Sequence, residues 1–133
     1  MPLEYSYLVA SVLFYFVMIL VQATTGALHH GAVPLLGARD SLNPDSPFLA
    51  RTKRATANML ENLVLFAPLV VVAVETGNAN GATHFGAGLF LGARILYAPF
   101  YWFAVPLRPL AWFAGIVGTL IVASQILPFT GAA

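Results

Sequence analysis

An uncharged apolar stretch from Tyr5 to Leu28 constrains the fold of this chain more than any other feature of its sequence. A helix rises about 1.5 Å per residue, so this stretch is long enough to cross a hydrocarbon core of about 30 Å. No basic segment precedes it, and it is longer than the apolar region of a secretory signal peptide. We therefore expect an uncleaved membrane-spanning helix here.

The rest of the chain has the same apolar character. Of its 133 residues, 59% are hydrophobic and only 8% are charged, which is not the composition of a soluble domain. Turn-forming residues and prolines divide the apolar sequence into four segments. The sequence predicts an all-α fold, an integral membrane four-helix bundle that forms one transmembrane domain over residues 1–133. The expected spans are residues 5–28, 55–75, 83–103 and 106–128.

The segment 29–53 is rich in Gly, Pro, Ser, Asn and charged residues, which predicts a loop outside the apolar region. Arg39 and Asp40 could form a local ion pair in this loop. His29 and His30 are adjacent and have no evident Cys or acidic partners, so we expect no metal site. The chain contains no cysteine, and thiol chemistry would need a thiol that the substrate brings.

Apart from Arg94, the lysine and arginine residues lie on one side of the expected bundle. Basic connections tend to face the cytoplasm, so we expect a multi-pass protein whose termini and 78–81 turn face the opposite side. The net charge of +1 gives no basic surface for nucleic acid. The cations on the basic side are Arg39, Arg51, Lys53, Arg54 and Arg108.

The second span carries polar residues on one helix face within the stretch RATANMLENLVLFAP. Arg54, Asn58 and Glu61 are spaced i, i+4 and i+7, which places all three side chains on that face. Charged groups are costly inside a membrane, and they commonly mark a functional site or a pair of partners. We therefore expect a binding site on this face.

The third span has a polar face of its own. Arg94, Tyr97 and Tyr101 are spaced i, i+3 and i+7, and Arg108 follows seven residues later. Because the second and third spans run in opposite directions, these residues reach depths similar to that of Glu61. The sequence predicts a polar, net basic pocket that opens at the cytoplasmic interface. The aromatic residues expected around it are Tyr97, Tyr101, Trp102 and Trp112.

The same residues also have a purely structural interpretation. Glu61 and Arg94 could neutralise each other inside the bundle, and the aromatic residues could form an interfacial belt. For a single pair of charges this interpretation is the simpler one. One carboxylate cannot balance Arg54, Arg94 and Arg108 together, however, so an anionic ligand would complete the site.

At these residues the chain resembles the membrane-associated proteins in eicosanoid and glutathione metabolism, the MAPEG family. The likeness lies in RATANMLENLVLFAP and in GARILYAPFYWFAVPLR, and the GARD of the first loop resembles the bacterial branch. The resemblance implies a homotrimer of four-helix subunits in the bacterial inner membrane, with the active-site side cytoplasmic. It also implies that glutathione binds between neighbouring subunits. Gly88 and Gly92, four residues apart, could support close helix packing.

The resemblance further implies the roles of individual residues. A thiolate is the nucleophilic form of a thiol, and a nearby guanidinium stabilises it. By its match to the family, Arg108 is the catalytic residue that holds the sulfur of glutathione as thiolate. The glutathione-binding residues implied in the same way are Arg54, Asn58, Glu61, Arg94, Tyr97 and Tyr101.

Three positions differ from specialised members of the family. Asn62 stands where some members have a tyrosine ligand, Ala57 where the prostaglandin synthases have an arginine, and Pro109 where the prostaglandin-E synthase has a serine. These differences favour a broad glutathione transferase or peroxidase that acts on lipophilic small molecules at the membrane, in contact with membrane lipids.

Two other classes of function stay open. A protein of the same fold could bind lipids or act as a scaffold without chemistry. A small proton-coupled exporter would need an acid in its first span, which has none, and the arginines would repel a cationic drug.

Overall fold

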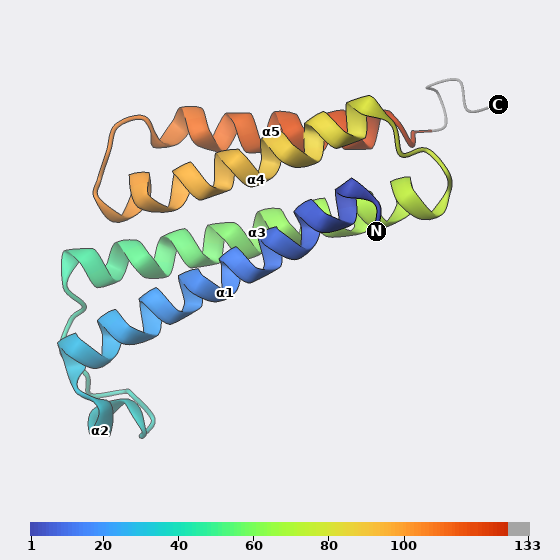
Figure 1. The fold of residues 1–133 in the computed structure, drawn as a ribbon. Helices are drawn as coiled ribbons and strands as arrows, with labels where there is room; N and C mark the ends of the chain where they lie inside the picture. Colours follow the sequence, from blue (N-terminus) through green and yellow to red (C-terminus); the bar gives the residue numbers. More distant parts are fainter. Residues whose placement is uncertain (128–133) are drawn as a thin grey trace.

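The computed structural model describes residues 1–127, and this part of the chain contains helices and no strands. The expectation of an all-α fold is therefore confirmed. Helix α1 packs on α3 and α4, and α5 packs mainly on α4, so that the four long helices lie roughly along one direction (Figure 1). The helices are α1 (Leu3–His30), α2 (Ala32–Leu35), α3 (Pro47–Glu75), α4 (Gly81–Trp102) and α5 (Arg108–Ser124).

Two of these helices, α1 and α3, are long and apolar enough to cross a membrane. Helix α4 contains Arg94, and α5 has 17 residues, a length of about 26 Å. The four-span layout stays a prediction. The expected end of the fourth span at Pro128 lies outside the described residues.

The prediction of a loop over residues 29–53 is wrong at both ends, because α1 continues to His30 and α3 already begins at Pro47, and residues 32–35 between them form α2. Ser46 is the N-cap, and its Oγ accepts a hydrogen bond from the Leu49 amide at 3.2 Å. A proline in the first helical turn needs no backbone N–H and has a suitable φ angle, so it starts this helix instead of excluding it. Lys53 and Arg54 are therefore helical residues.

The loop also contains an ion-pair cluster that we did not expect. The Asp45 carboxylate lies 2.7 Å from Lys53 Nζ and 2.8 Å from His30 Nε2. His30 thus has an acidic partner after all, fifteen residues away in sequence. The Arg39 Nε donates to the Leu35 carbonyl at 2.9 Å, and within the described residues no ion pair joins Arg39 to Asp40.

The Asp45 cluster leads to a test of pH dependence. The hydrogen bond from Lys53, and after it the one from His30, hold the pKa of the Asp45 carboxyl below its ordinary value of 3.8. Such a carboxylate adds stability above its unfolded-state pKa, and this stability is lost as pH falls through the folded-state pKa. The Lys53 side chain is 47% exposed, so we expect Asp45→Asn to destabilise by less than about 1 kcal/mol.

Thermal unfolding in detergent, measured between pH 7 and pH 2, checks this expectation. The difference between wild type and Asp45→Asn should be constant near neutral pH and should close once the pH is well below 3.8. A difference of equal size at every pH would show that Asp45 stabilises the fold without its charge.

The opposite end of the molecule holds a polar cluster that ties α1 to the start of α4. The Glu4 side chain is fully buried, and its Oε1 accepts a hydrogen bond from Thr83 Oγ1. His84 Nε2 lies 3.2 Å from the same carboxylate oxygen. Next to this cluster, the Tyr5 hydroxyl donates to the Glu75 carboxylate at the end of α3. These contacts hold the N-terminus of α1 against both neighbouring helices.

Apolar packing joins the helices between these two ends. The rings of Phe66 on α3 and Phe90 on α4 stack with centroids 3.9 Å apart, and Met18 of α1 is buried in the same core. The core therefore lies where α1, α3 and α4 meet.

Helices α4 and α5 approach each other closely at Gly86 and Gly118. A Cβ atom on Gly118 would lie 2.5 Å from the Gly86 carbonyl oxygen and 2.8 Å from the Phe90 amide nitrogen. The glycine pair singled out in the sequence does not make this contact. A Cβ on Gly88 would meet the Tyr7 ring, and one on Gly92 would meet nothing within 4 Å.

Candidate functional site

Three adjoining cavities open where α3 begins, α4 ends and α5 begins, and Arg108 lines all of them. Their volumes are about 460, 250 and 310 Å³. We call them together the basic cleft. Its polar and aromatic lining residues are Arg51, Arg54, Asn58, Glu61, Tyr97, Phe100, Tyr101, Arg108 and Trp112.

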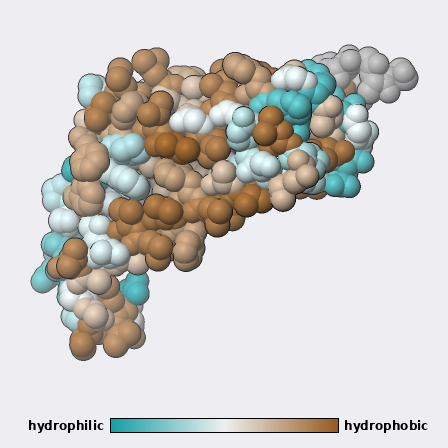
Figure 2. Space-filling model, viewed as in Figure 1, coloured by the Kyte–Doolittle hydropathy of each residue, from teal (hydrophilic) through white to brown (hydrophobic). Residues whose placement is uncertain are grey.

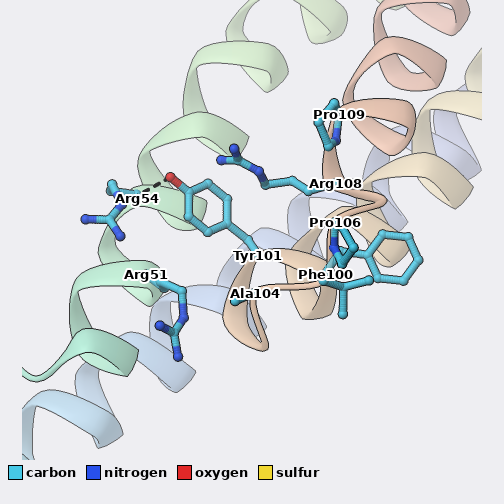
Figure 3. A pocket seen from close by; sticks show the side chains of 9 residues that line it. Arg51, Arg54, Phe100, Tyr101, Ala104, Pro106, Arg108 and Pro109 are labelled. Atoms are coloured by element: carbon cyan, nitrogen blue, oxygen red, sulfur yellow. Dashed lines mark hydrogen bonds between the residues drawn. The ribbon is translucent and has the colours of Figure 1, made fainter.

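Tyr101 of α4 lies between Arg54 and Arg108 at the centre of the cleft (Figure 3). Arg54 Nε of α3 donates to the Tyr101 hydroxyl at 3.1 Å. The guanidinium carbon of Arg108 lies 4.5 Å from the centroid of the same ring, a distance typical of a cation–π contact. One aromatic side chain thus positions cations from two other helices.

The turn between α4 and α5 determines where Arg108 lies. At the end of α4 the Val105 amide donates to the Phe100 carbonyl at 2.8 Å, and the Ala104 amide donates to the Tyr101 carbonyl at 3.2 Å. These are the two bonds of a Schellman motif. Ala104 has a φ of 55°, in the left-handed region where glycine is usual. Helix α5 then begins at Arg108. The first turn of a helix carries a partial positive charge, which favours a nearby anion.

Arg51 of α3 forms a hydrogen bond with the end of α4, next to this turn. Its Nε donates to the Trp102 carbonyl at 2.9 Å, so a side chain of α3 pairs with one of the last carbonyl groups of α4. Trp102 itself packs against the core and does not line the cleft, whereas Trp112 does. Of the two tryptophans expected around the pocket, only Trp112 lies there.

Arg94 is buried behind the cleft and does not line it. Its side chain is among the largest that are fully buried, with 1% of the residue exposed. Its Nη2 donates to Asn58 Oδ1 at 2.8 Å, and its guanidinium carbon lies 4.2 Å from the Tyr97 ring centroid. Its Nε and Nη1 are buried without a hydrogen-bond partner among the described residues.

Asn58 connects this buried cation to the cleft. Its amide oxygen accepts from Arg94 and, at 3.2 Å, from Asn62 Nδ2. Asn62 also donates to the Asn58 backbone carbonyl at 2.8 Å. Because the oxygen is occupied by these donors, the Asn58 amide nitrogen is left to donate into the cleft that the residue lines.

Glu61 is exposed at the outer edge of the cleft. The described residues contain no ion pair between Glu61 and Arg94, so the two do not neutralise each other directly. Arg54, Arg94 and Arg108 also have no carboxylate partner in this part of the chain. The site is therefore strongly cationic.

The structure brings together the residues that the two helical faces suggested. Of the seven predicted site residues, six line the cleft, and Arg94 contacts two of these, Asn58 and Tyr97, from behind. The sequence reasoning missed Arg51 and Phe100 in the cleft wall. Arg51 lies one helical turn before Arg54 on the same polar face, and that spacing could have identified it.

Comparison with curated proteins finds no match to the chain. The family model described as the MAPEG family matches residues 6–127. This match covers the basic cleft and nearly all of the helices, and it confirms the resemblance seen in the sequence. The chain belongs to the MAPEG family, a family of membrane proteins.

Proposed function

We propose that the protein is a glutathione-dependent membrane transferase or peroxidase that acts on lipophilic electrophiles. The observation that carries this proposal is the gathering of three guanidinium groups, those of Arg54, Arg94 and Arg108, without a paired carboxylate. Unpaired cations in a membrane protein are costly, and an anionic ligand would offset the cost. Membership in the family supports a glutathione-related function in general.

The chemistry of the lining residues fits glutathione, which carries two carboxylates, one ammonium group and a thiol. Arg54 would hold a carboxylate, because its guanidinium matches carboxylate geometry. Glu61 is the one acid of the cleft and would pair with the ammonium group. The Asn58 amide nitrogen and the hydroxyls of Tyr97 and Tyr101 would supply further hydrogen bonds.

Arg94 acts through Asn58 in this proposal. It is too deeply buried to reach the cleft, but its hydrogen bond to Asn58 Oδ1 holds the amide in one orientation. Its stacking on Tyr97 positions a second wall residue in the same way. Arg94 is therefore a positioning residue.

Glutathione, when bound, supplies a thiol whose ionised form is the nucleophile. Arg108 keeps its charge in surroundings of low polarity and would stabilise a sulfur anion relative to the thiol. The ring of Tyr101, 4.5 Å from the Arg108 guanidinium carbon, restricts the orientations that the Arg108 side chain can adopt. Arg108 is thus the residue to which we assign thiolate stabilisation.

An apolar cavity of about 540 Å³ between α4 and α5 supports a lipophilic second substrate. Phe100 lines both this cavity and the basic cleft, and Leu107, next to Arg108, lines the apolar side. An apolar molecule dissolved in the bilayer could therefore approach the cationic residues. A non-catalytic lipid-binding or scaffold protein is the alternative, and it predicts occupancy of this cavity without turnover of glutathione.

The same proposal includes the assembly and the topology. We propose a homotrimer of four-span bundles, each a single domain, in a bacterial inner membrane with the basic cleft on the cytoplasmic side. Arg54, Ala57 and Glu61 lie exposed along one face of α3, and a neighbouring subunit packed on that face would enclose the ligand.

Calorimetry of glutathione binding to the detergent-purified protein tests this function with a matched pair of glutamates on α3. Glu61→Gln should weaken binding about tenfold or more, because it removes a charged hydrogen-bond partner. Glu75→Gln, at the far end of the same helix, should leave the affinity unchanged. No binding at millimolar glutathione would overturn the proposed function, whereas binding without turnover of any electrophile would favour the non-catalytic alternative.

A further inference from the structure

A separate cavity of about 220 Å³ lies where α1 ends and α3 begins, enclosed by α2 and the connection that follows it. None of its lining residues lines the basic cleft. Apolar side chains form most of its wall, and two cations lie among them. The residues on which the argument rests are Ile19, Leu35, Leu42 and Leu49, with Arg39 and Lys53.

Arg39 is held in place but has spare donors. Its backbone φ is 69°, an uncommon value for a residue with a side chain. Its Nε donates to the Leu35 carbonyl at 2.9 Å, and its two Nη groups have no hydrogen bond or ion pair in the part of the chain that the structure describes. A guanidinium fixed in this way presents two parallel N–H donors to an anion.

Lys53 faces the same cavity from α3. Its Nζ is 2.7 Å from the Asp45 carboxylate, which also contacts His30. Asp40, beside Arg39, is exposed and has no ion pair among the described residues. The residues that line the cavity include these two cations and no carboxylate, and Asp45, the carboxylate in contact with Lys53, is shared with His30.

The position of the cavity places it at a membrane surface. Helix α1 has 28 residues and is about 42 Å long, so its ends extend beyond a hydrocarbon core of about 30 Å. Around α2 three large apolar side chains are almost fully exposed, Leu28 at 83%, Val33 at 78% and Leu36 at 84%. The segment around α2 projects from the rest of the molecule (Figure 1), and the space-filling view shows apolar surface at its tip (Figure 2). A short segment of this kind is suited to the headgroup region of a bilayer.

We propose that this cavity binds the phosphate group of an anionic phospholipid from the surrounding bilayer. Arg39 holds the phosphate oxygens through its two Nη groups, and Lys53 adds a second positive charge. The first methylenes of the lipid pack against Leu35 and Leu42, while the exposed apolar residues around α2 insert beside it. The site explains why Arg39 and Lys53 lie close to exposed apolar side chains at this end of the molecule.

Native mass spectrometry of the detergent-purified full chain tests this proposal with phosphatidylglycerol and phosphatidylcholine of identical acyl chains. Wild type should bind the anionic lipid more tightly. A direct contact between a partly exposed cation and the phosphate adds up to about fivefold in affinity, so Arg39→Gln should cost about fivefold and the double variant with Lys53→Gln about 25-fold. Arg51→Gln removes a charge from the same end of α3 but outside the cavity, and should have little effect.

Two results would overturn the proposal. Equal weakening by Arg39→Gln and Arg51→Gln would mean that the lipid responds only to overall charge. Competition by free glycerol phosphate at concentrations that match the lipid would mean that the cavity takes a soluble phosphate instead. Glutathione affinity of Arg39→Gln, measured in the same preparation, should equal that of wild type because the two cavities share no residue.

Discussion

Replacement of Arg108 by alanine is expected to abolish the thiolate signal of bound glutathione and to lower kcat about 100-fold. The estimate follows from the loss of one preorganised group that stabilises developing or resident negative charge. Arg108 lines every part of the basic cleft and is positioned by the Tyr101 ring, so no other cation can take its place without moving. Ultraviolet difference absorbance on adding glutathione reports the thiolate, and steady-state turnover of a lipophilic electrophile reports kcat.

Two further measurements separate this role from simple ligand binding. Arg108→Lys keeps the charge but loses the planar guanidinium, and it should restore part of the thiolate signal. An analogue of glutathione with a methyl group in place of the thiol should bind wild type and Arg108→Ala with similar affinity. If the alanine variant formed thiolate as wild type does, the assigned role of Arg108 would be wrong, although the cleft could still bind the peptide.

The second large effect is expected at the contact between α4 and α5. Gly118→Ala should destabilise the fold by about 3 kcal/mol, because overpacking against rigid atoms forces the backbone to shift. The atoms in the way are the Gly86 carbonyl oxygen and the Phe90 amide nitrogen, neither of which can rotate aside. Thermal unfolding in detergent, followed by circular dichroism, measures the loss.

Gly92→Ala is the matched control for this prediction. The substitution is the same and the residue is also helical, but a Cβ there meets nothing within 4 Å. Alanine is favoured over glycine in a helix by about 1 kcal/mol, so Tm should be unchanged or slightly higher. Equal Tm values for the two variants would show that the close approach at Gly118 is not needed for stability.

The binding faces could be predicted from sequence because helical periodicity determines them. Arg54, Asn58 and Glu61 share one face of α3 by spacing alone, and Arg94, Tyr97 and Tyr101 share one face of α4. The composition and the long uncharged first helix likewise predicted the all-α fold. These features depend on residues close together in the chain.

Other features depend on contacts between distant residues, and the sequence pattern did not reveal them. The partner of Arg94 is Asn58, 36 residues away, and not Glu61, which lies on the same helix as Asn58. The buried carboxylate of Glu4 is matched by Thr83, 79 residues away. Close packing involves Gly86 and not Gly92, because the relative rotation of two helices decides which glycine faces a partner.

The glycine contact between α4 and α5 has a mechanical consequence for the basic cleft. Two helices whose backbones come this close cannot slide or rotate against each other without a clash, so the contact restricts how α4 can move relative to α5. This pair of helices carries Tyr97, Tyr101 and Arg108, whereas Arg54 and Asn58 belong to α3. The two walls of the cleft therefore belong to different parts of the bundle, and a change in the angle between α3 and the α4–α5 pair would widen or narrow it.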